Sequence, residues 1–403
     1  MLVWRALKLE RRYHMKKWVK IPDVLFFQEG PGVRNTQYTS TGVKLLNVAN
    51  LVDGKIDLST SDRFISEDEA YGKYKHFMCD EGDFVVASSG IKVEYIDKKM
   101  GFIEKSMLPL CMNTSTIRFK VLDTRELNIR YFMYYLKSSH FKEQLSRYIT
   151  GSAQLNYGPS HLKKMVMPIV SICEQQEIIS LLDETQVLIE LRKQQLEKLD
   201  TLIKARFVEM FGDEKHHLSL QEVCSIITDG THQPPKFVPA GIPFIFVSNI
   251  VGNTITYEAE KYIDQATYDE LIRRTPIEIG DILLSTVGSY GHPAVVKSDR
   301  KFLFQRHIAY LKPKHNIVNS DYLHGAILSS DAQQQIEEAV KGIAQKTLNL
   351  SEIRKITIPV PPLEAQSEFA AFVSQVDKSK VAVQAALDKA QLLFNSLMQQ
   401  YFG

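Results

Sequence analysis

The chain has 403 residues, 44% of them hydrophobic and 10% aromatic, which is enough for two or three domains with cores and excludes a disordered protein. A formal net charge of +2 at pH 7 means that any surface for nucleic acid has to be local. The four cysteines have neither disulfide nor zinc spacing, and no apolar run is long enough to cross a bilayer, so the composition favours a cytoplasmic protein.

The first segment, residues 1–14, carries several lysine and arginine residues and is not typical of a signal peptide. It has no counterpart ahead of the second repeat, which is described below. We therefore expect residues 1–14 to be an extension before the true start, and a chain that begins at Met15 to assemble and bind normally.

Residues 1–168 are predicted to form a first domain of mixed α/β structure. Short apolar stretches such as 84–86 are typical of strands, and glycine, asparagine and proline clusters separate them. Ser88-Ser89-Gly90 follows one predicted strand, and Asn113-Thr114-Ser115 precedes another. Hydroxyl and main-chain N–H groups in such loops suit phosphates or base edges, but an ordinary turn has the same composition.

Residues 169–212 are predicted to form a long helix. A capping-box pattern from Ser171 to Glu174 comes just after Pro168. From there mostly apolar side chains alternate at steps of four and three residues, which is the a/d period of a coiled coil. The apolar seam residues of this first helix are Ile178, Leu182, Ile189, Leu196, Leu199 and Ile203.

The second half of the chain repeats the first. The segment 151–154 recurs at 342–345, a displacement of 342 − 151 = 191 residues, and the same displacement carries Gln175 onto Gln366. The Gly-Asp pairs at 82–83 and 280–281 match at 280 − 82 = 198. The chain is therefore a tandem duplication in which the helical parts are similar and the preceding parts have diverged.

Residues 213–358 are predicted to form the second α/β domain, with strands within 242–248, 282–284 and 294–296. The loop 285–291 corresponds to the Ser88 loop of the first domain. Gln305 and Arg306, just before another strand, can reach adenine or guanine edges, although buried hydrogen bonding at a strand end explains them equally well. The turns around 151–154 and 342–346 suit phosphate contacts or plain connections.

Residues 359–403 are predicted to form the second long helix, which starts after three prolines. An antiparallel pair of helices lets each domain leave from an opposite end, so the predicted fold is α+β: two α/β domains in tandem repeat, separated by two long helices in an antiparallel coiled coil. The seam residues of the second helix are Phe369, Val373, Val376, Val383, Leu387, Phe394 and Leu397.

Several of these motifs carry a family resemblance. Gly-x-Ala-Gln, the segment Ile-Pro-Val-Pro-Pro-Leu-Glu-Ala-Gln at 358–366 and the long helix that follows resemble the conserved region of Type I restriction-modification specificity (HsdS) subunits, and the arrangement occurs twice. Gly241-Ile242-Pro243 with Asn249, Gly280-Asp281 and Gln305 to Ala309 resemble signatures of that family's target recognition domains. Family members often have arginine where this chain has Ser88 and Thr286.

The resemblance implies a subunit without catalysis that reads a bipartite DNA site through its two domains. The helices would dock partners: M subunits, two in number, that methylate adenine N6 with S-adenosylmethionine, and R subunits that use ATP and magnesium. No cofactor or metal is expected on this chain itself. The candidate DNA-binding residues are Ser88, Ser89, Lys92, Asn113, Thr114, Ser115, Gln154, Thr231, His232, Ser285, Thr286, Ser289, Tyr290, Gln305, Arg306, His307, Gln345 and Lys346.

The sequence contains no Asn-Pro-Pro-Tyr methylation motif, phosphate-binding loop or His-Glu-x-x-His motif, in agreement with a chain without catalysis. Two other interpretations stay open: a coiled-coil scaffold whose lateral domains bind protein or sugar, and a stand-alone nuclease. The predicted helix also limits the spacing of the two half-sites. Residues 174–211 give a helix of roughly 57 Å, or about 17 base pairs of DNA, with the half-site centres expected about one helical turn apart.

Overall fold

The computed structural model describes residues 16–149, 156–341 and 346–403, and the segment 1–14 lies outside them. The chain divides into two compact units. The first comprises residues 1–191 and 387–403, and the second comprises residues 192–386. Each unit contains a four-stranded antiparallel sheet, a smaller sheet and part of each long helix. Among the described residues, no helix is both long and apolar enough to cross a membrane.

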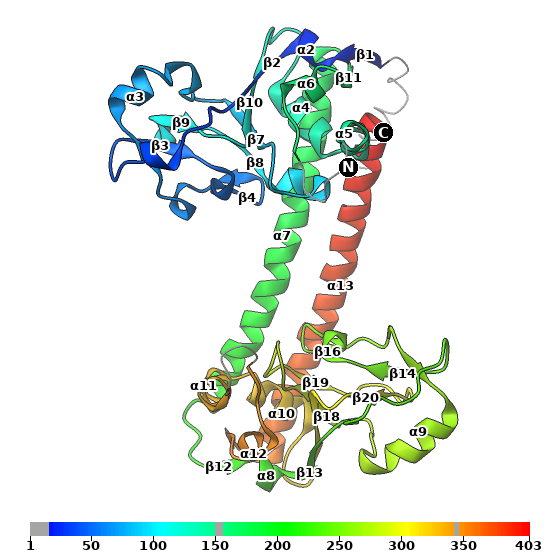
Figure 1. Ribbon diagram of the computed structural model, residues 1–403. Coiled ribbons are helices and arrows are strands. Elements are labelled where there is room, and N and C mark those ends of the chain that lie inside the picture. Colours follow the sequence, from blue (N-terminus) through cyan, green and yellow to red (C-terminus); the bar gives the residue numbers. More distant parts are fainter. Residues whose placement is uncertain (1–15, 150–155, 342–345) are drawn as a thin grey trace. The chain divides into compact units, whose positions relative to one another are not determined.

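In the first unit the larger sheet has the strand order β2-β10-β7-β8 and the smaller one the order β6-β3-β9, while β1 pairs with β11 and β4 with β5 (Figure 1). The strands are β1 Lys17–Lys20, β2 Leu25–Glu29, β3 Val43–Leu46, β4 Leu51–Val52, β5 Lys55–Ile56, β6 Phe64–Ile65, β7 Phe84–Ala87, β8 Met100–Phe102, β9 Leu110–Met112, β10 Thr116–Val121 and β11 Val166–Ile169. The helices are α2 Ile21–Val24, α3 Glu67–Tyr71, α4 Ile129–Lys137, α5 Ser139–Tyr148 and α6 Pro159–Leu162.

The second unit repeats this topology, with the orders β13-β21-β18-β19 and β17-β14-β20, and with β12 paired to β22 and β15 to β16. Its strands are β12 His217–Ser219, β13 Cys224–Asp229, β14 Ile242–Ile245, β15 Ile250–Val251, β16 Thr254–Ile255, β17 Tyr262–Ile263, β18 Ile282–Ser285, β19 Pro293–Val295, β20 Leu303–Phe304, β21 Ile308–Pro313 and β22 Thr357–Pro359. Its helices are α8 Leu220–Val223, α9 Gln265–Leu271, α10 Ser320–Ile327, α11 Ser330–Ala339 and α12 Leu350–Ile353. The two matching sheets agree with the predicted duplication.

The two long helices are α7, Ile172–Phe211, and α13, Leu363–Phe402, of 40 residues each. The predicted capping box at the start of α7 is present, because the Glu174 carboxylate accepts the Ser171 N–H at 2.9 Å and the Ser171 hydroxyl accepts the Glu174 N–H at 3.4 Å. In α13 the prolines before Leu363 mark the start, as expected. The starts of both long helices are therefore set by residues close to them in the sequence.

Each long helix is attached to its domain by a buried glutamine near its start. The Gln175 amide donates to Glu126 O and accepts the Asn128 N–H at 2.9 Å, and Gln366 does the same with Ile317 O at 3.0 Å and the Asn319 N–H at 2.8 Å. Both glutamine side chains are fully buried. This shared pattern explains why the repeat keeps glutamine at both positions, since a buried amide without partners is costly.

Within the second unit α7 and α13 are antiparallel and packed against each other. Asp200 pairs with Lys380, and Arg206 pairs with Glu368 at 3.1 Å, so partner numbers fall along α13 as they rise along α7. The predicted class, α+β with two long helices in an antiparallel pair, is confirmed. In the first unit the same pairing brings the end of α13 to α4, where the rings of Tyr131 and Phe402 lie 5.0 Å apart.

The burial of the seam differs along the helices. The seam residues Ile178, Leu182 and Phe369 are buried, whereas Leu196 and Leu199 are only half-buried. The predicted seam also leaves out two aromatic side chains of α7, Phe207 and Phe211, which are buried in the structure. A straight helix of 3.6 residues per turn drifts by about 20° per heptad from a strict 3.5-residue pattern, which moves the buried face at the far end of α7.

Candidate nucleic-acid interface

Three loops meet at one end of the larger sheet in each unit. Strand β10 is antiparallel to both β2 and β7, so the segment before β10 lies beside the segments that follow β2 and β7. In the second unit β21 stands in the same relation to β13 and β18. The candidate contact residues therefore gather in two groups, at 88–92 with 113–115 and at 231–232 with 285–290 and 305–307.

The first unit joins its serine loop to the segment before β10. The Ser89 hydroxyl donates to the Ser115 hydroxyl at 2.6 Å, and the Ser88 N–H donates to Ser115 O at 2.8 Å. Ser88 is buried, whereas Thr114 and Lys92 are exposed. These two exposed side chains are the ones in this group that are free to reach a ligand.

Asn113, in the same group, has a structural role. Its amide donates to Asn47 Oδ1 at 2.8 Å and its carbonyl oxygen accepts the Thr114 N–H, and the side chain is buried. The neighbouring loop passes so close that a Cβ at Gly30 would lie 2.0 Å from Asn113 O. The hydrogen bonds of Asn113 therefore hold the turn together, which is the structural alternative that the sequence left open.

In the second unit the loop after β18 is held by its backbone. The Thr286 N–H donates to His307 O at 3.0 Å, the Thr286 carbonyl accepts the Leu348 N–H at 2.9 Å, and the Ser285 hydroxyl accepts the His292 N–H at 3.0 Å. Both side chains, Ser285 and Thr286, are buried, and Ser289 is exposed. Ser289 is therefore the accessible hydroxyl of this loop.

The turn before β21 presents an exposed arginine. Thr231 pairs with Gln305 in a parallel bridge, and the Arg306 N–H donates to Thr231 O at 3.1 Å. The Arg306 side chain is exposed, while burial, with help from Arg306, lowers the pKa of His307 and keeps its ring neutral at pH 7. Within the described residues, Arg306 is an exposed cation of this group that forms no ion pair with a carboxylate.

An arginine that sequence reasoning missed lies beside this turn. Arg274 Nη2 contacts Asp229 Oδ1 at 2.5 Å, and His232 Nε2 contacts Asp229 Oδ2 at 2.8 Å. Arg274 is 42 residues from His232, so no local pattern could have linked them. The shared carboxylate orients both side chains at the edge of the group.

Lys346 is already paired within the second unit. Its amine contacts Glu337 Oε1 at 2.8 Å and donates to the Tyr290 hydroxyl at 3.3 Å, and the same hydroxyl donates to Glu337. Lys346 and Tyr290 are thereby held together, with much of the lysine charge neutralised. The remaining candidates, Gln154 and Gln345, lie outside the described residues.

The aspartates of the two Gly-Asp turns have structural partners. Asp83 accepts the Asp80 N–H at 2.9 Å and pairs with buried Arg118 at 3.2 Å. Asp281 accepts the Glu278 N–H and the Tyr310 hydroxyl, both at 2.7 Å, and burial raises its pKa. This family-like signature therefore closes a turn on the sheet and does not itself supply an exposed contact.

We expect the substitution Asp83→Ala to lower the free energy of unfolding of the first unit by about 3 kcal/mol, because it leaves the buried Arg118 cation without its carboxylate. The oxygens of Gln28, Met78 and His76 still accept from Arg118, which limits the loss. Urea unfolding followed by tryptophan fluorescence measures the effect, because Trp18 lies in β1 of the first unit. The exposed ion pair of Asp80 gives the control: Asp80→Ala is expected to cost under about 1 kcal/mol, and an equal cost for both variants would contradict the prediction.

The described residues contain no cluster of three or more histidine, cysteine, aspartate or glutamate side chains that could hold a metal ion.

The family model described as the Type I restriction modification DNA specificity domain matches residues 32–201 and 214–390. The chain is similar to the Type I restriction enzyme EcoBI specificity subunit of Escherichia coli, with 26% identity over 170 residues, or 42% of this chain and 36% of that relative. It is also similar to the Type I restriction enzyme MjaVIII specificity subunit of Methanocaldococcus jannaschii, with 26% identity over 186 residues, or 45% of this chain and 42% of the relative. The alignments thus span less than half the length of these relatives.

Two solved structures have a similar fold. One comes from a study of complex assembly and conformational transition of the type I R-M system, with a TM-score of 0.58, 16% identity, and coverage of 97% of this chain and 99% of the other. The other is the S subunit of a Type I restriction-modification system from M. genitalium, with a TM-score of 0.50, 15% identity and coverage of 96% of both chains. At these identities the similarity concerns the fold.

Proposed function

The chain belongs to the family of Type I restriction-modification DNA specificity subunits, and from that premise we propose that each unit reads one half of a bipartite DNA target. The observation that carries the proposal is that both family matches contain the same three loops at the end of a four-stranded sheet. We assign target recognition to residues 1–168 and 213–358, and docking to 169–212 and 359–403. The half-sites are unlike, because the two loop groups present different side chains.

The exposed members of each loop group are the proposed DNA contacts. A cation at a loop tip can pair with a phosphate or a guanine edge, and hydroxyl groups can accept or donate at either. The buried Ser88, Asn113, Ser285 and Thr286 support the loops. The proposed contacts are the exposed Lys92 and Thr114 in the first unit and the exposed His232, Ser289 and Arg306 in the second. We add two residues of the second unit to them, the half-buried Thr231 and Lys346, which is exposed and paired with Glu337.

In this proposal the chain recognises the DNA target and supplies no catalytic step. We propose that partner M subunits bring S-adenosylmethionine for adenine methylation, and that R subunits bring ATP and magnesium for cleavage, in the cytoplasm of a prokaryotic cell. The seam residues hold α7 and α13 together, so partners meet the outer faces of the helices. Exposed apolar side chains of the two helices outside the seam are Val187, Leu191 and Leu392 in the first unit and Leu202 and Val208 in the second.

The test compares one exposed cation from each loop group. In the complex with its methyltransferase, Arg306→Ala is expected to cost about 1–3 kcal/mol of DNA affinity and to relax specificity within one half-site only. Lys92→Ala is expected to weaken binding through the other unit. Binding to DNA with each half-site scrambled in turn, at several salt concentrations, measures both effects.

Arg125, an exposed arginine after the other end of β10, provides the control, and Arg125→Ala should leave affinity and specificity unchanged. Retention that does not depend on DNA sequence or salt would instead favour the scaffold interpretation. A loss of specificity in both half-sites on substituting Arg306 alone would contradict the assignment of one half-site to each unit.

A further inference from the structure

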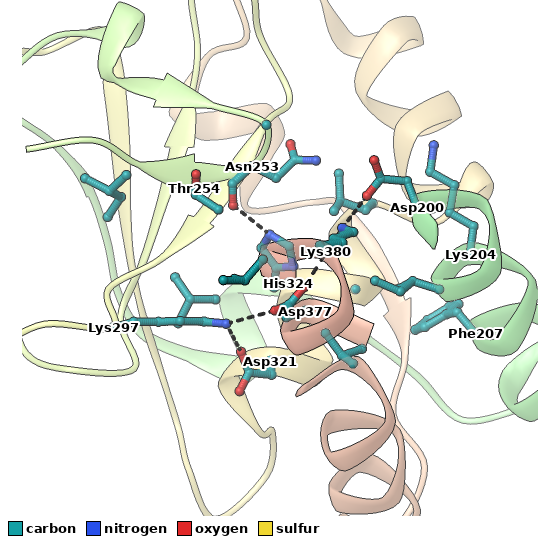
Figure 2. A pocket seen from close by; sticks show the side chains of 18 of the residues that line it. Asp200, Lys204, Phe207, Asn253, Thr254, Lys297, Asp321, His324, Asp377 and Lys380 are labelled. Atoms are coloured by element: carbon teal, nitrogen blue, oxygen red, sulfur yellow. Dashed lines mark hydrogen bonds and ion pairs between the residues drawn. The ribbon is translucent and has the colours of Figure 1, made fainter. Parts of the chain in front are cut away.

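The second unit contains a cavity of about 610 Å³ that the proposed DNA contacts do not use. It lies between α7, α10 and α13, with the β15–β16 hairpin and the end of β19 closing it (Figure 2). This volume is in the range of small-molecule sites, which are mostly apolar with a few placed polar groups. The apolar walls include Ile203, Phe207, Val295, Leu328 and Val373.

The carboxylates at the cavity are all paired. Lys297 contacts Asp377 at 3.3 Å and Asp321 at 3.5 Å, and Asp200 pairs with Lys380, as the dashed lines of Figure 2 show. These three carboxylates share two lysines, so each of them has a lysine beside it, and a cationic ligand would have to compete with that contact.

Lys204, on α7, is the exception among these charges. Within the described part of the chain, no carboxylate lies within 4.0 Å of its amine. The Lys204 side chain lines the cavity and is exposed, so its charge costs little to keep there without a ligand. An anionic group in the cavity would find a cation that no other side chain neutralises.

A neutral histidine forms part of the cavity wall. His324 Nε2 lies 3.3 Å from Asn253 O, and because a carbonyl oxygen only accepts, the ring donates Nε2–H to it. Burial lowers the pKa of His324, so the ring adds no positive charge at pH 7. Lys204 therefore remains the cation of the cavity wall for which the described residues show no ion pair.

The duplication supplies an internal comparison. At the displacement of 191 residues the counterparts of Gly325, His324 and Lys204 are Tyr134, Met133 and Asn395. The ring of Tyr134 is buried 6.5 Å from that of Phe394, the counterpart of the wall residue Ile203. In the first unit the ring of Tyr134 thus lies against Phe394, the counterpart of a cavity-wall residue. Asparagine stands there in place of Lys204, so the cation has no counterpart.

Gly325 explains why the second unit differs. A Cβ at this position would lie 2.6 Å from a ring carbon of Phe369, so no side chain fits while Phe369 occupies its place. The first unit has the smaller Ile178 where the second has Phe369, which leaves room for Tyr134. The cavity is therefore a consequence of the Gly325 and Phe369 pair.

We propose that this cavity binds a small organic anion, with its anionic group beside Lys204 and its apolar body against Phe207 and Val373. Among the described residues, the first unit has Tyr134 at the position of Gly325 and Asn395 at the position of Lys204, so we expect one such site per chain. The ligand contacts α7, α10, α13 and the β15–β16 hairpin at once and stabilises the packing of the recognition domain on the helices of its unit. This inference does not depend on DNA recognition.

The experiment titrates the full chain with anilinonaphthalene sulfonate, an aromatic anion, and follows fluorescence and heat. One site per chain is expected. Lys204→Met, an exposed position, should weaken binding about tenfold by removing the cation. Val381→Trp, at an exposed lining position, should weaken it by at least as much by filling the opening.

Each variant has a matched control on the same helix that does not line the cavity. Lys198→Met on α7 and Leu392→Trp on α13, whose leucine is as exposed as Val381, should bind the dye like the unchanged chain. Neutral phenylnaphthylamine should bind more weakly than the sulfonate and should not respond to Lys204→Met. Equal binding by all the variants would overturn the site, and equal binding of the two dyes would overturn its preference for an anion.

Discussion

A heptad inserted into both long helices at the same level is expected to lengthen the unread spacer of the DNA target by about three base pairs and to leave both half-sites unchanged. Seven residues add about 10 Å of helix and keep the a/d seam in register. At roughly 3.4 Å per base pair this corresponds to about three pairs. Methylation mapping in cells that carry the variant measures the spacer.

The structure decides where the insertions belong. Sequence equivalence pairs Asp200 with Gln391 at the displacement of 191, but in the antiparallel pair Asp200 faces Lys380. The insertions therefore go after Asp200 in α7 and after Ser379 in α13, so that every facing pair keeps its partner. An insertion into α7 alone is the control and should abolish assembly, because it shifts one helix against the other. The old spacing, or new half-sites, in the double variant would contradict a spacer set by the helices.

The second large effect is expected at Phe369, where Phe369→Ala should destabilise the second unit by about 3–5 kcal/mol. The ring is fully buried, with its centroid 5.4 Å from that of Phe207, 5.7 Å from Phe211 and 6.1 Å from Tyr322. Its removal leaves a void where both long helices meet α10. Thermal and urea unfolding followed by circular dichroism measures the loss.

Leu392→Ala, at an exposed position on the same helix, is the control and should change stability by less than about 0.5 kcal/mol. The half-buried Leu196 is expected to fall between the two. A cost at Phe369 no greater than that at Leu196 would mean that the middle of the helix pair, and not the aromatic cluster, holds the second unit together.

The sequence by itself determined the features that arise from short-range chemistry and from repetition. The spacing of apolar residues predicted both long helices, prolines and a capping box located their starts, and the displacement of 191 residues showed the duplication. The apolar stretches at 84–86 and 282–284 are strands β7 and β18. The sequence also located the loops of candidate contact residues, but their grouping at one end of each sheet became clear only from the order of the strands.

Tertiary structure alone decided which side chains stay exposed and which serve the fold. Asn113 is a candidate DNA contact in the sequence and Asp83 belongs to the repeated Gly-Asp pair, yet both side chains are buried and bonded to Asn47 and Arg118, which lie dozens of residues away. A cavity next to Gly325 depends on the bulk of Phe369, which no local pattern reports. Hydrogen-bond partners and packing volume are set by segments distant in the chain, so they become visible only when the sheets and helices are assembled.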